Sequence, residues 1–201
     1  MKIRDLMIEV CLTITERASI QEALEVMKVN SIRHLPVVTE NNRLVGFVTL
    51  ADLRAGLMPS MISQVSLADL IIRDPITVHP DDDIEVAAQL IYNHRIGGLP
   101  VVENGRVVGI LTESDILRAF IDMMGILTST SRVDVVMDNS PDSLNKALRI
   151  ISDCGGDIIN VGTSGRRAAK KTYCFRLSSC KTDAIREALE NEGFSVMAAM
   201  D

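Results

Sequence analysis

Two copies of one short phrase hold the side chains best suited to chemistry in this chain. Thr49 and Asp52 occur in the run Gly-Phe-Val-Thr-Leu-Ala-Asp, and Thr112 and Asp115 occur in the run Gly-Ile-Leu-Thr-Glu-Ser-Asp. In both copies an apolar run that predicts a strand gives way to a helical pattern. At such a junction backbone N–H groups and a threonine hydroxyl can donate to a phosphate oxygen, and the carboxylate can accept from ribose hydroxyls. The phrase therefore predicts a binding site of nucleotide type.

The same spacing of threonine and aspartate also fits a capping box, in which the two side chains only satisfy the first turn of a helix. A single copy would be explained equally well in that way. Two copies in register, each following a Leu-Pro-Val-Val run, favour at least one nucleotide-type site. A purely structural role as helix caps stays open as the alternative.

An internal repeat gives both phrases the same surroundings. Asp5 and Asp69 begin an offset of 64 residues that continues through the Leu-Pro-Val-Val runs at 35–38 and 99–102. The offset becomes 63 after the following turn, where one residue is missing from the second copy. Such self-similarity indicates two copies of one supersecondary unit.

Each copy predicts the order β-α-β-β-α. Ser19 and Glu22 are spaced as a capping box for the first helix, and Asp83 precedes the corresponding helix of the second copy. The runs 44–50 and 107–112 are apolar almost throughout, which indicates strands covered on both faces. Extended pieces and hairpin turns complete the pattern and are expected at 12–15, 76–79, 40–42 and 104–105.

From about residue 131 the pattern changes to β-α-β-β-α-β. Ser140 and Pro141 mark a helix start, and glycines at 155–156 and 193 mark helix stops. The chain is therefore predicted to be an α/β (α+β) protein, with two β-α-β-β-α repeats before a ferredoxin-like domain. The expected strands of that domain are 132–137, 158–162, 172–177 and 194–200, and its expected helices are 142–154 and 183–192.

The paired repeats resemble CBS domains through the duplicated Gly-hydrophobic-x-Thr-x-x-Asp and Leu-Pro-Val-Val motifs, over about residues 1–124. Tandem CBS repeats form Bateman modules, so the resemblance implies a pseudo-two-fold module with repeats at 1–64 and 65–127. It also implies a regulatory ligand, namely AMP, ADP, ATP or S-adenosylmethionine, with no covalent cofactor. Each of the two clefts would offer one Thr and one Asp.

The resemblance further implies that the two clefts differ. Arg33 and His34, which precede the first Leu-Pro-Val-Val run, would lean toward the cleft of Thr112 and Asp115. Arg118, which lies one helical turn beyond Asp115, could also approach a phosphate in this cleft. This cleft is expected to be the better site. Simple surface exposure of the two arginines is the alternative.

The other cleft, with Thr49 and Asp52, would face Gly97 and Gly98, which leave room but less positive charge. It is expected to take a smaller ligand or none. In this family the base edge usually lies against the first short strand of the same repeat. The resemblance therefore implies base contacts to Thr77 and Val78, or to Thr13 and Ile14.

The last part of the chain, 131–201, resembles an ACT domain in its order of elements and in the run 138–144. Many ACT domains have Gly after the Pro of this run, where an amino-acid ligand approaches the backbone. Asp142 stands there in this chain, which argues against amino-acid binding. The resemblance implies a homodimer formed by sheet pairing. The combination is similar to bacterial acetoin-utilisation CBS–ACT proteins, which implies a regulatory role in carbon metabolism.

Charge and cysteine usage exclude several function classes. A formal net charge of −6 and a pI near 5.1 oppose binding to nucleic acid or to an anionic membrane. Four isolated cysteines without metal-ligand spacing and no long uncharged apolar stretch predict a cytoplasmic protein. The most basic stretch of the chain is expected to be a solvated hairpin loop. It contains Arg166, Arg167, Lys170 and Lys171.

No enzymatic motif accompanies the predicted ligand site. His34, His79 and His94 lie in no pattern with a nucleophile or a metal ligand, and the sequence has no P-loop or Gly-x-Ser-x-Gly motif. The acidic run 81–83 could hold a metal ion, but unpaired N–H groups favour acidic residues at a helix start. The chain is therefore expected to be a sensor and not an enzyme, with a ligand-free assembly module as the alternative.

Overall fold

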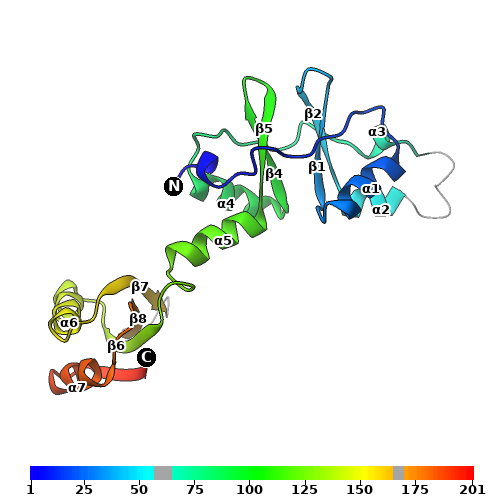
Figure 1. Cartoon of the computed structure of the whole chain (residues 1–201). Helices are drawn as coiled ribbons and strands as arrows, with labels where there is room; N and C mark the ends of the chain where they lie inside the picture. Colours follow the sequence, from blue (N-terminus) through cyan, green and yellow to red (C-terminus); the bar gives the residue numbers. More distant parts are fainter. Residues whose placement is uncertain (57–64, 165–169) are drawn as a thin grey trace. The chain divides into compact units, whose positions relative to one another are not determined.

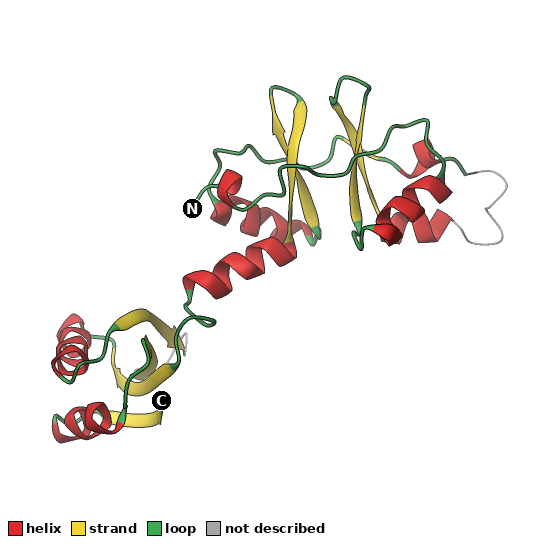
Figure 2. Cartoon of the chain, in the orientation of Figure 1, coloured by secondary structure: helices red, strands yellow, loops and turns green. Residues whose placement is uncertain are grey.

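The computed structural model describes residues 1–56, 65–164 and 170–201, which form two compact units, Met1–Leu117 and Arg118–Asp201. The first unit contains the two sequence repeats except for the last residues of the second, blue to green in Figure 1, and the second unit has its own sheet and helices. Both units combine helices with strands (Figure 2). The predicted α+β class is confirmed.

The repeat unit follows the predicted order of elements. Its first copy consists of the 3-10 helix η1 (Ile3–Asp5), α1 (Ile20–Val29), β1 (His34–Val38), β2 (Leu44–Thr49) and α2 (Leu50–Gly56). Its second copy consists of α3 (Leu67–Leu70), β3 (Ile72–Arg73), α4 (Ile84–His94), β4 (Gly98–Glu103), β5 (Arg106–Thr112) and α5 (Glu113–Met123). The expected extended pieces are reduced to single parallel bridges, Ile14 to Val37 and Val78 to Val101.

Local capping explains where the helices begin. The hydroxyl oxygen of Ser19 accepts from the N–H of Glu22 at 3.1 Å, and the Glu22 carboxylate accepts from the N–H of Ser19 at 2.7 Å. This is the predicted capping box of α1. Asp83 stands at the N-cap of α4, as expected, but its side chain makes no capping hydrogen bond and pairs with Lys2 at 2.9 Å.

The hairpin turns follow from residues that accept a left-handed backbone. Asn104 and Gly105 have φ of 52° and 76°, which is the conformation of a tight two-residue hairpin turn. Asn42 has φ of 58° in the first hairpin. Its side-chain amide donates to the carbonyl of Val107 at 2.7 Å, so the two hairpins stand side by side, as Figure 1 also shows.

The leading segments of the two repeats are exchanged between the sheets. β3 opens the second repeat, but it pairs with β2 of the first, with Ile72 opposite Phe47. Ile8 of the first repeat forms the corresponding bridge with Ile110 of β5. The sheets are therefore β1-β2-β3 and β4-β5, and each receives backbone from the other repeat. This exchange decides which residues surround the clefts.

Apolar side chains from helices and strands form the core of each unit. In the first repeat the strands β1 and β2 pack against α1 through a buried cluster that includes Ile14, Ala23, Met27, Leu35, Val37, Val48 and Leu53. Aromatic residues contribute little, because they make up only 3% of the chain. Aliphatic residues and Met therefore supply the burial that stabilises these thin layers.

The second unit has the ferredoxin-like topology that the sequence predicts. Its elements are β6 (Ser131–Asp138), α6 (Pro141–Asp153), β7 (Ile158–Ser164), β8 (Lys170–Leu177), α7 (Asp183–Asn191) and β9 (Ser195–Met200). The strands form one antiparallel sheet in the order β7-β8-β6-β9. Its core joins the sheet to both helices and includes Val133, Val135, Phe175, Leu177, Ala147, Ile151, Ile185 and Leu189.

Candidate functional site

The duplicated Thr and Asp side chains are bonded to each other in both repeats. The hydroxyl of Thr49 donates to Oδ2 of Asp52 at 2.5 Å, and the hydroxyl of Thr112 donates to Oδ2 of Asp115 at 2.6 Å. The same carboxylate oxygens accept from the backbone N–H of Thr49 at 3.2 Å and of Thr112 at 2.8 Å. In the first repeat the N–H of Asp52 also donates to the hydroxyl oxygen of Thr49 at 3.3 Å, which completes a capping box there.

This geometry changes the role expected of the threonine. Its proton is already donated to the aspartate, so the hydroxyl can only accept a further hydrogen bond. The next N–H groups are also used, because Leu50 donates to the carbonyl of Arg33 at 2.8 Å and Glu113 to that of Gly97 at 3.1 Å. Among the described residues, Oδ1 of Asp52 and of Asp115 receives no hydrogen bond. This oxygen is the acceptor that the motif leaves available.

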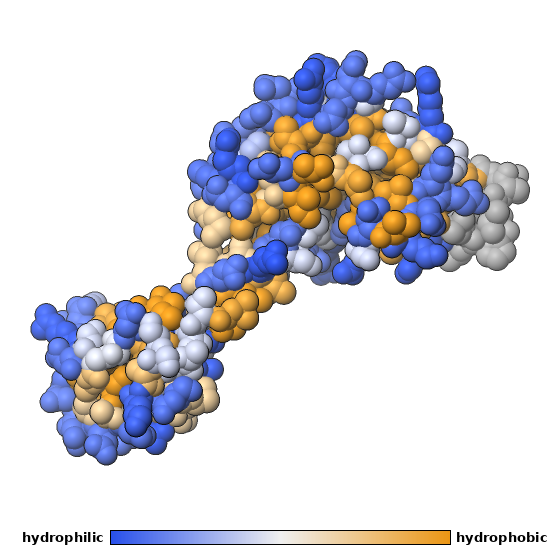
Figure 3. All heavy atoms as spheres, viewed as in Figure 1, coloured by the Kyte–Doolittle hydropathy of each residue, from blue (hydrophilic) through white to orange (hydrophobic). Residues whose placement is uncertain are grey.

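Each phrase borders a cavity. Cleft A, of 440 Å³, lies at Thr112. Its wall comes mainly from the exchanged leading segment and from the end of α1 onward, and it includes Ile8, Val10, Cys11, Leu12, Ser31, Ile32, Arg33, His34, Gly97, Ile110, Glu113 and Ser114. Much of this wall is apolar, in keeping with the apolar surface that Figure 3 shows on the repeat unit. Burial raises the pKa of the Cys11 thiol, which therefore stays neutral at pH 7.

Cleft B, of 610 Å³, lies at Thr49 and Asp52. Gly97 and Gly98 line it, as the resemblance implied. Its wall also carries charged residues that the sequence analysis did not place there, namely Arg33, Arg54, Asp74, Arg95 and Glu113. Cleft B has more arginines than expected, but its three arginines are matched by the three carboxylates of Asp52, Asp74 and Glu113.

Four residues form a wall common to both clefts: Arg33, His34, Gly97 and Glu113. The His34 ring stacks on Phe47, with centroids 5.8 Å apart and an angle of 15° between the rings. A Cβ added to Gly97 would lie 2.7 Å from Nε2 of His34, so the imidazole is packed directly against this glycine. Burial, assisted by the charge of Arg33, lowers the pKa of His34 and favours its neutral form.

Five of the predicted site residues line the clefts, namely Arg33, His34, Thr49, Asp52 and Thr112, whereas Asp115 and the residues expected at the base do not. Arg33 and His34 border Thr112, as predicted, and they border Thr49 as well. The lining of clefts A and B includes neither the pair Thr77 and Val78 nor the pair Thr13 and Ile14. Val78 and Ile14 are buried against β4 and β1 instead.

The exchange of leading segments explains this difference. Ile8 and residues 10–12 of the first repeat line cleft A, beside Thr112 of the second repeat, and residues 74–76 of the second repeat line cleft B. Each cleft therefore receives its leading segment from the opposite repeat, a few residues before the expected positions. Arg118 lies on α5, in the unit that begins at this residue, and its approach to a phosphate stays a prediction.

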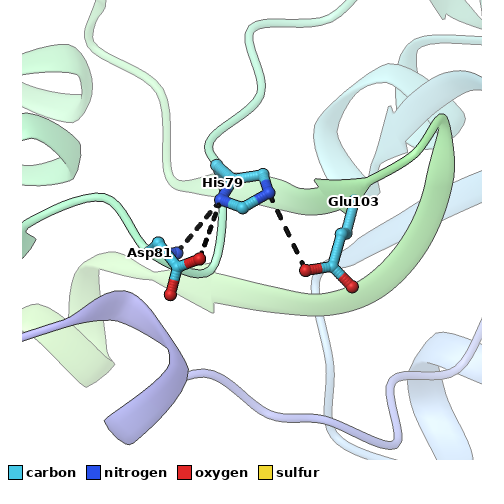
Figure 4. Close-up of side chains that lie close together, drawn as sticks. All are labelled: His79, Asp81 and Glu103. Atoms are coloured by element: carbon cyan, nitrogen blue, oxygen red, sulfur yellow. Dashed lines mark hydrogen bonds and ion pairs between the residues drawn. The ribbon is translucent and has the colours of Figure 1, made fainter.

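A second group of polar side chains lies at the acidic run 81–83 (Figure 4). Nδ1 of His79 accepts from the N–H of Asp81 at 3.2 Å, and its Nε2 lies 3.8 Å from a carboxylate oxygen of Glu103. These three residues have the side-chain types of a metal site. The guanidinium of Arg4 already neutralises Asp81, however, and Asp82 accepts from the N–H of His79 at 2.8 Å. The run therefore fits its expected role at the start of α4.

The second unit shows the expected helix start. The Ser140 hydroxyl accepts from the N–H of Ser143 at 3.1 Å, Pro141 opens α6, and Asp142 is exposed. Asn139, which directly follows β6, accepts from the hydroxyl of Tyr173 on β8 at 2.9 Å. The residues of the basic stretch differ in their placement. Lys170 and Lys171 begin strand β8 and do not lie in a loop, whereas Arg166 and Arg167 lie outside the described residues.

None of the helices in the described ranges is both long enough and apolar enough to cross a bilayer.

Comparisons with known proteins cover the repeat unit. The family model of the CBS domain matches residues 3–58 and 67–122. Homoserine O-acetyltransferase from Methanococcoides burtonii is 40% identical over 117 residues, which are 58% of this chain and 23% of that relative. This chain thus spans about a quarter of the length of such curated relatives.

Three solved structures are similar to the same part of the chain. The CBS domain pair of protein MJ0100, in complex with 5′-methylthioadenosine and S-adenosyl-L-methionine, is 32% identical with a TM-score of 0.56, covering 60% of this chain and 99% of that one. AcuB from Vibrio cholerae, described as an acetoin utilization protein, is 30% identical with a TM-score of 0.57 and coverages of 63% and 95%. CBSX2 in complex with AMP is 29% identical with a TM-score of 0.55 and coverages of 60% and 96%. A second structure of CBSX2 names Arabidopsis thaliana as its source.

Proposed function

The chain belongs to the CBS domain family, and on that premise we propose that it senses an adenine nucleotide or a related adenosyl ligand in clefts A and B. The observation that carries this proposal is the duplicated Thr-Asp pair, which leaves one carboxylate oxygen available in each repeat and borders a cavity with Thr49 and Asp52 at cleft B and with Thr112 at cleft A. Ribose hydroxyls are suitable donors to such an oxygen. The ligands of MJ0100 and CBSX2 support the adenosyl class.

The ligand acts as a regulator in this proposal and is not a substrate. A bound ligand can shift the arrangement of a protein only if it binds two arrangements with different affinity. Such a ligand can move the wall common to both clefts. In this wall His34 of the first repeat packs against Gly97 of the second repeat. The enzymes named among the relatives do not argue for catalysis here, since the match covers about a quarter of their length.

The second unit is proposed to be an ACT-like domain through which two chains form a homodimer. Its βαββαβ order supports the assignment, and its edge strand β9 carries Met197 and Met200 with exposed fractions of 67% and 51%. A regulatory role in acetoin or carbon metabolism belongs to the same proposal and rests on the likeness to AcuB. Light scattering of the full chain tests the dimer, and a monomer at micromolar concentration would refute it.

A ligand-free assembly module is the competing function. The observation that favours it is the capping geometry, which is complete at Thr49 and Asp52 and is reproduced at Thr112 and Asp115 by the bonds to the carboxylate. The two functions differ in what the aspartates do beyond capping. A matched comparison of capping residues inside and outside the clefts can therefore separate them.

The deciding experiment is a thermal-shift titration of AMP, ADP, ATP and S-adenosylmethionine with four proteins. These are the wild type, Asp52→Ala, Asp115→Ala and Glu22→Ala, the last of which removes the capping carboxylate of α1 outside both clefts. Each variant should lose some stability because its cap is incomplete. A ligand at 100 times its Kd should stabilise the wild type and Glu22→Ala by about 2.7 kcal/mol.

The sensor is supported if a cleft variant loses part of that ligand-induced stabilisation while Glu22→Ala keeps it. If no ligand stabilises the wild type, the assembly module becomes the better explanation. The same holds if all three variants respond to ligand like the wild type.

A further inference from the structure

The two clefts can be compared position by position, because the repeat offset, 64 before the first hairpin turn and 63 after it, pairs each lining residue with a counterpart. Arg95 and Asp74 line cleft B, whereas their counterparts Ser31 and Val10 line cleft A. Arg54 also lines cleft B. Charged side chains of one cleft thus stand where the other cleft has uncharged ones.

Residues common to both clefts cannot distinguish them, and these include the charges of Arg33 and Glu113. Beyond the common wall, four charged residues line cleft B: Asp52, Arg54, Asp74 and Arg95. The described residues that line cleft A add no further charged side chain, and several of them are apolar. The clefts therefore differ in the number of charged side chains and in the arginines available to a phosphate, and not in formal net charge, because Asp52 and Asp74 match the two additional arginines of cleft B.

The arginines of cleft B are free to bind an anion. Within the described part of the chain, the side chains of Arg33, Arg54 and Arg95 make no ion pair and no hydrogen bond. A guanidinium group binds phosphate oxygens through paired, charge-assisted hydrogen bonds. The carboxylate of Asp74 lies in the same wall, so a ligand there must also present donors, which a ribose or an adenine amino group supplies.

Cleft A is suited to a different ligand. Ile8, Val10 and Leu12 of its leading segment contribute exposed apolar surface, with Val10 exposed to 91%. An apolar wall gains by covering a thioether or methyl group, but it offers no partner to a phosphate that must leave water. Arg33 is the one arginine that the described lining of cleft A contains.

We propose that the two clefts divide adenosine-containing ligands by charge. This inference rests on the proposed function. Cleft B takes a phosphorylated adenine nucleotide, with Arg54 and Arg95 at its phosphate, and cleft A takes an adenosine derivative without phosphate, such as a thioether. The division reverses the preference expected from the sequence, which assigned the better phosphate site to cleft A.

The repeat itself supplies the variants for a test. Arg95→Ser and Arg54→Leu copy the counterparts Ser31 and Leu117 into cleft B. Ser31 and Arg95 share a φ of 54°, so serine tolerates this backbone. Both arginines are exposed, and the double variant is therefore expected to fold. Arg149→Ser on α6 removes an exposed arginine outside both clefts and is the matched control.

Calorimetric titrations of the full chain with AMP and with 5′-methylthioadenosine measure the effect. The double variant should bind AMP about tenfold more weakly or worse, because charge-assisted hydrogen bonds are lost, and should bind 5′-methylthioadenosine as the wild type does. Arg149→Ser should bind both probes unchanged. Wild type saturated with AMP should still bind one 5′-methylthioadenosine per chain.

Two results would overturn the division while leaving ligand sensing intact. One is an unchanged affinity for AMP in the double variant, and the other is displacement of 5′-methylthioadenosine by AMP from a single site. A wild type that binds neither probe overturns the proposed function itself and the division with it. The two kinds of failure are therefore distinguishable.

Discussion

Replacing Gly97 by alanine should disturb the wall that the two clefts share. The added Cβ would lie 2.7 Å from Nε2 and 2.9 Å from Cε1 of His34. Contacts this short force the imidazole to move, but its ring is stacked on Phe47 and half-buried. Gly97 does not have the left-handed backbone that disfavours alanine, so the cost of the substitution is steric.

The magnitude follows from overpacking, which costs about 1–3 kcal/mol when a core must shift to admit a methyl group. Unfolding entropy of about 2.1 cal/mol/K per residue gives about 0.25 kcal/mol/K for a unit the size of Met1–Leu117. The melting midpoint of Gly97→Ala should therefore fall by about 4–12 °C. Both probes of the clefts should also bind more weakly, because the same wall borders cleft A and cleft B.

Differential scanning calorimetry of a double-mutant cycle checks this reasoning. Gly162→Ala is the control, because a Cβ there has no heavy atom within 4 Å. In the background of His34→Ala the cost of Gly97→Ala should largely disappear, since the imidazole that it meets is gone. The steric argument fails if Gly97→Ala is as harmless as Gly162→Ala, or if its cost is the same with and without the imidazole.

Three further predictions test other features of the fold. Gly46→Ala should lower the urea midpoint more than Gly97→Ala does. The added Cβ would lie 2.7 Å from the carbonyl oxygen of Ile72, a backbone atom fixed by the pairing of β2 with β3. Equal midpoints of the two variants would contradict this prediction. Burial and a neighbouring positive charge lower the pKa of His34 below 6.5, so the unfolded chain takes up the proton more readily and stability falls as pH drops below that value. His34→Gln should lose less stability than the wild type between about pH 7 and 5, and parallel losses would rule out this contribution. Asp134→Asn should lower the free energy of unfolding of the second unit by about 1–2 kcal/mol. The nearly buried carboxylate accepts two hydrogen bonds from Arg132, at 2.8 and 2.6 Å. An unchanged melting midpoint would show that this pair does not contribute to stability.

Sequence patterns predicted the elements well wherever several residues act together. The duplicated Leu-Pro-Val-Val runs became β1 and β4, and the expected elements of the second unit appear in order with ends that differ by about two residues or fewer. Capping residues such as Ser19 and turn residues such as Asn104 have local physical effects, which the sequence states directly. Periodicity and capping are properties of neighbouring residues, so one chain suffices to read them.

The composition of the clefts could be predicted only in part. Thr49, Thr112, Arg33 and His34 do border cavities, but the leading segments were assigned to the wrong cleft. Strand β3 has only two residues and the bridge at Ile8 has one, and segments this short leave no periodic signal. Their exchange is a tertiary choice that local patterns do not contain.

The arginines of cleft B were missed for a different reason. Arg54 and Arg95 stand near helix ends, where an exposed basic residue is ordinary and needs no functional explanation. The comparison that reveals them was available, because the offset of 64 sets Arg95 against Ser31. The choice between cap and ligand site, in contrast, could not be made from the sequence, since the same Thr-Asp spacing serves both.

The contact of His34 with Gly97 and Gly98 bears on how such a chain could arise from one ancestral repeat. His34 and Gly98 are counterparts under the offset of 64, and a Cβ on Gly98 would lie 3.5 Å from Cγ of His34. Two identical repeats, associated as separate subunits, would bring imidazole against imidazole at this point. Joining the copies in one gene removes that constraint, because one copy can then keep the bulky side chain while the other loses it. Fusion thus permits a fit between large and small residues that a symmetric pair of subunits cannot form.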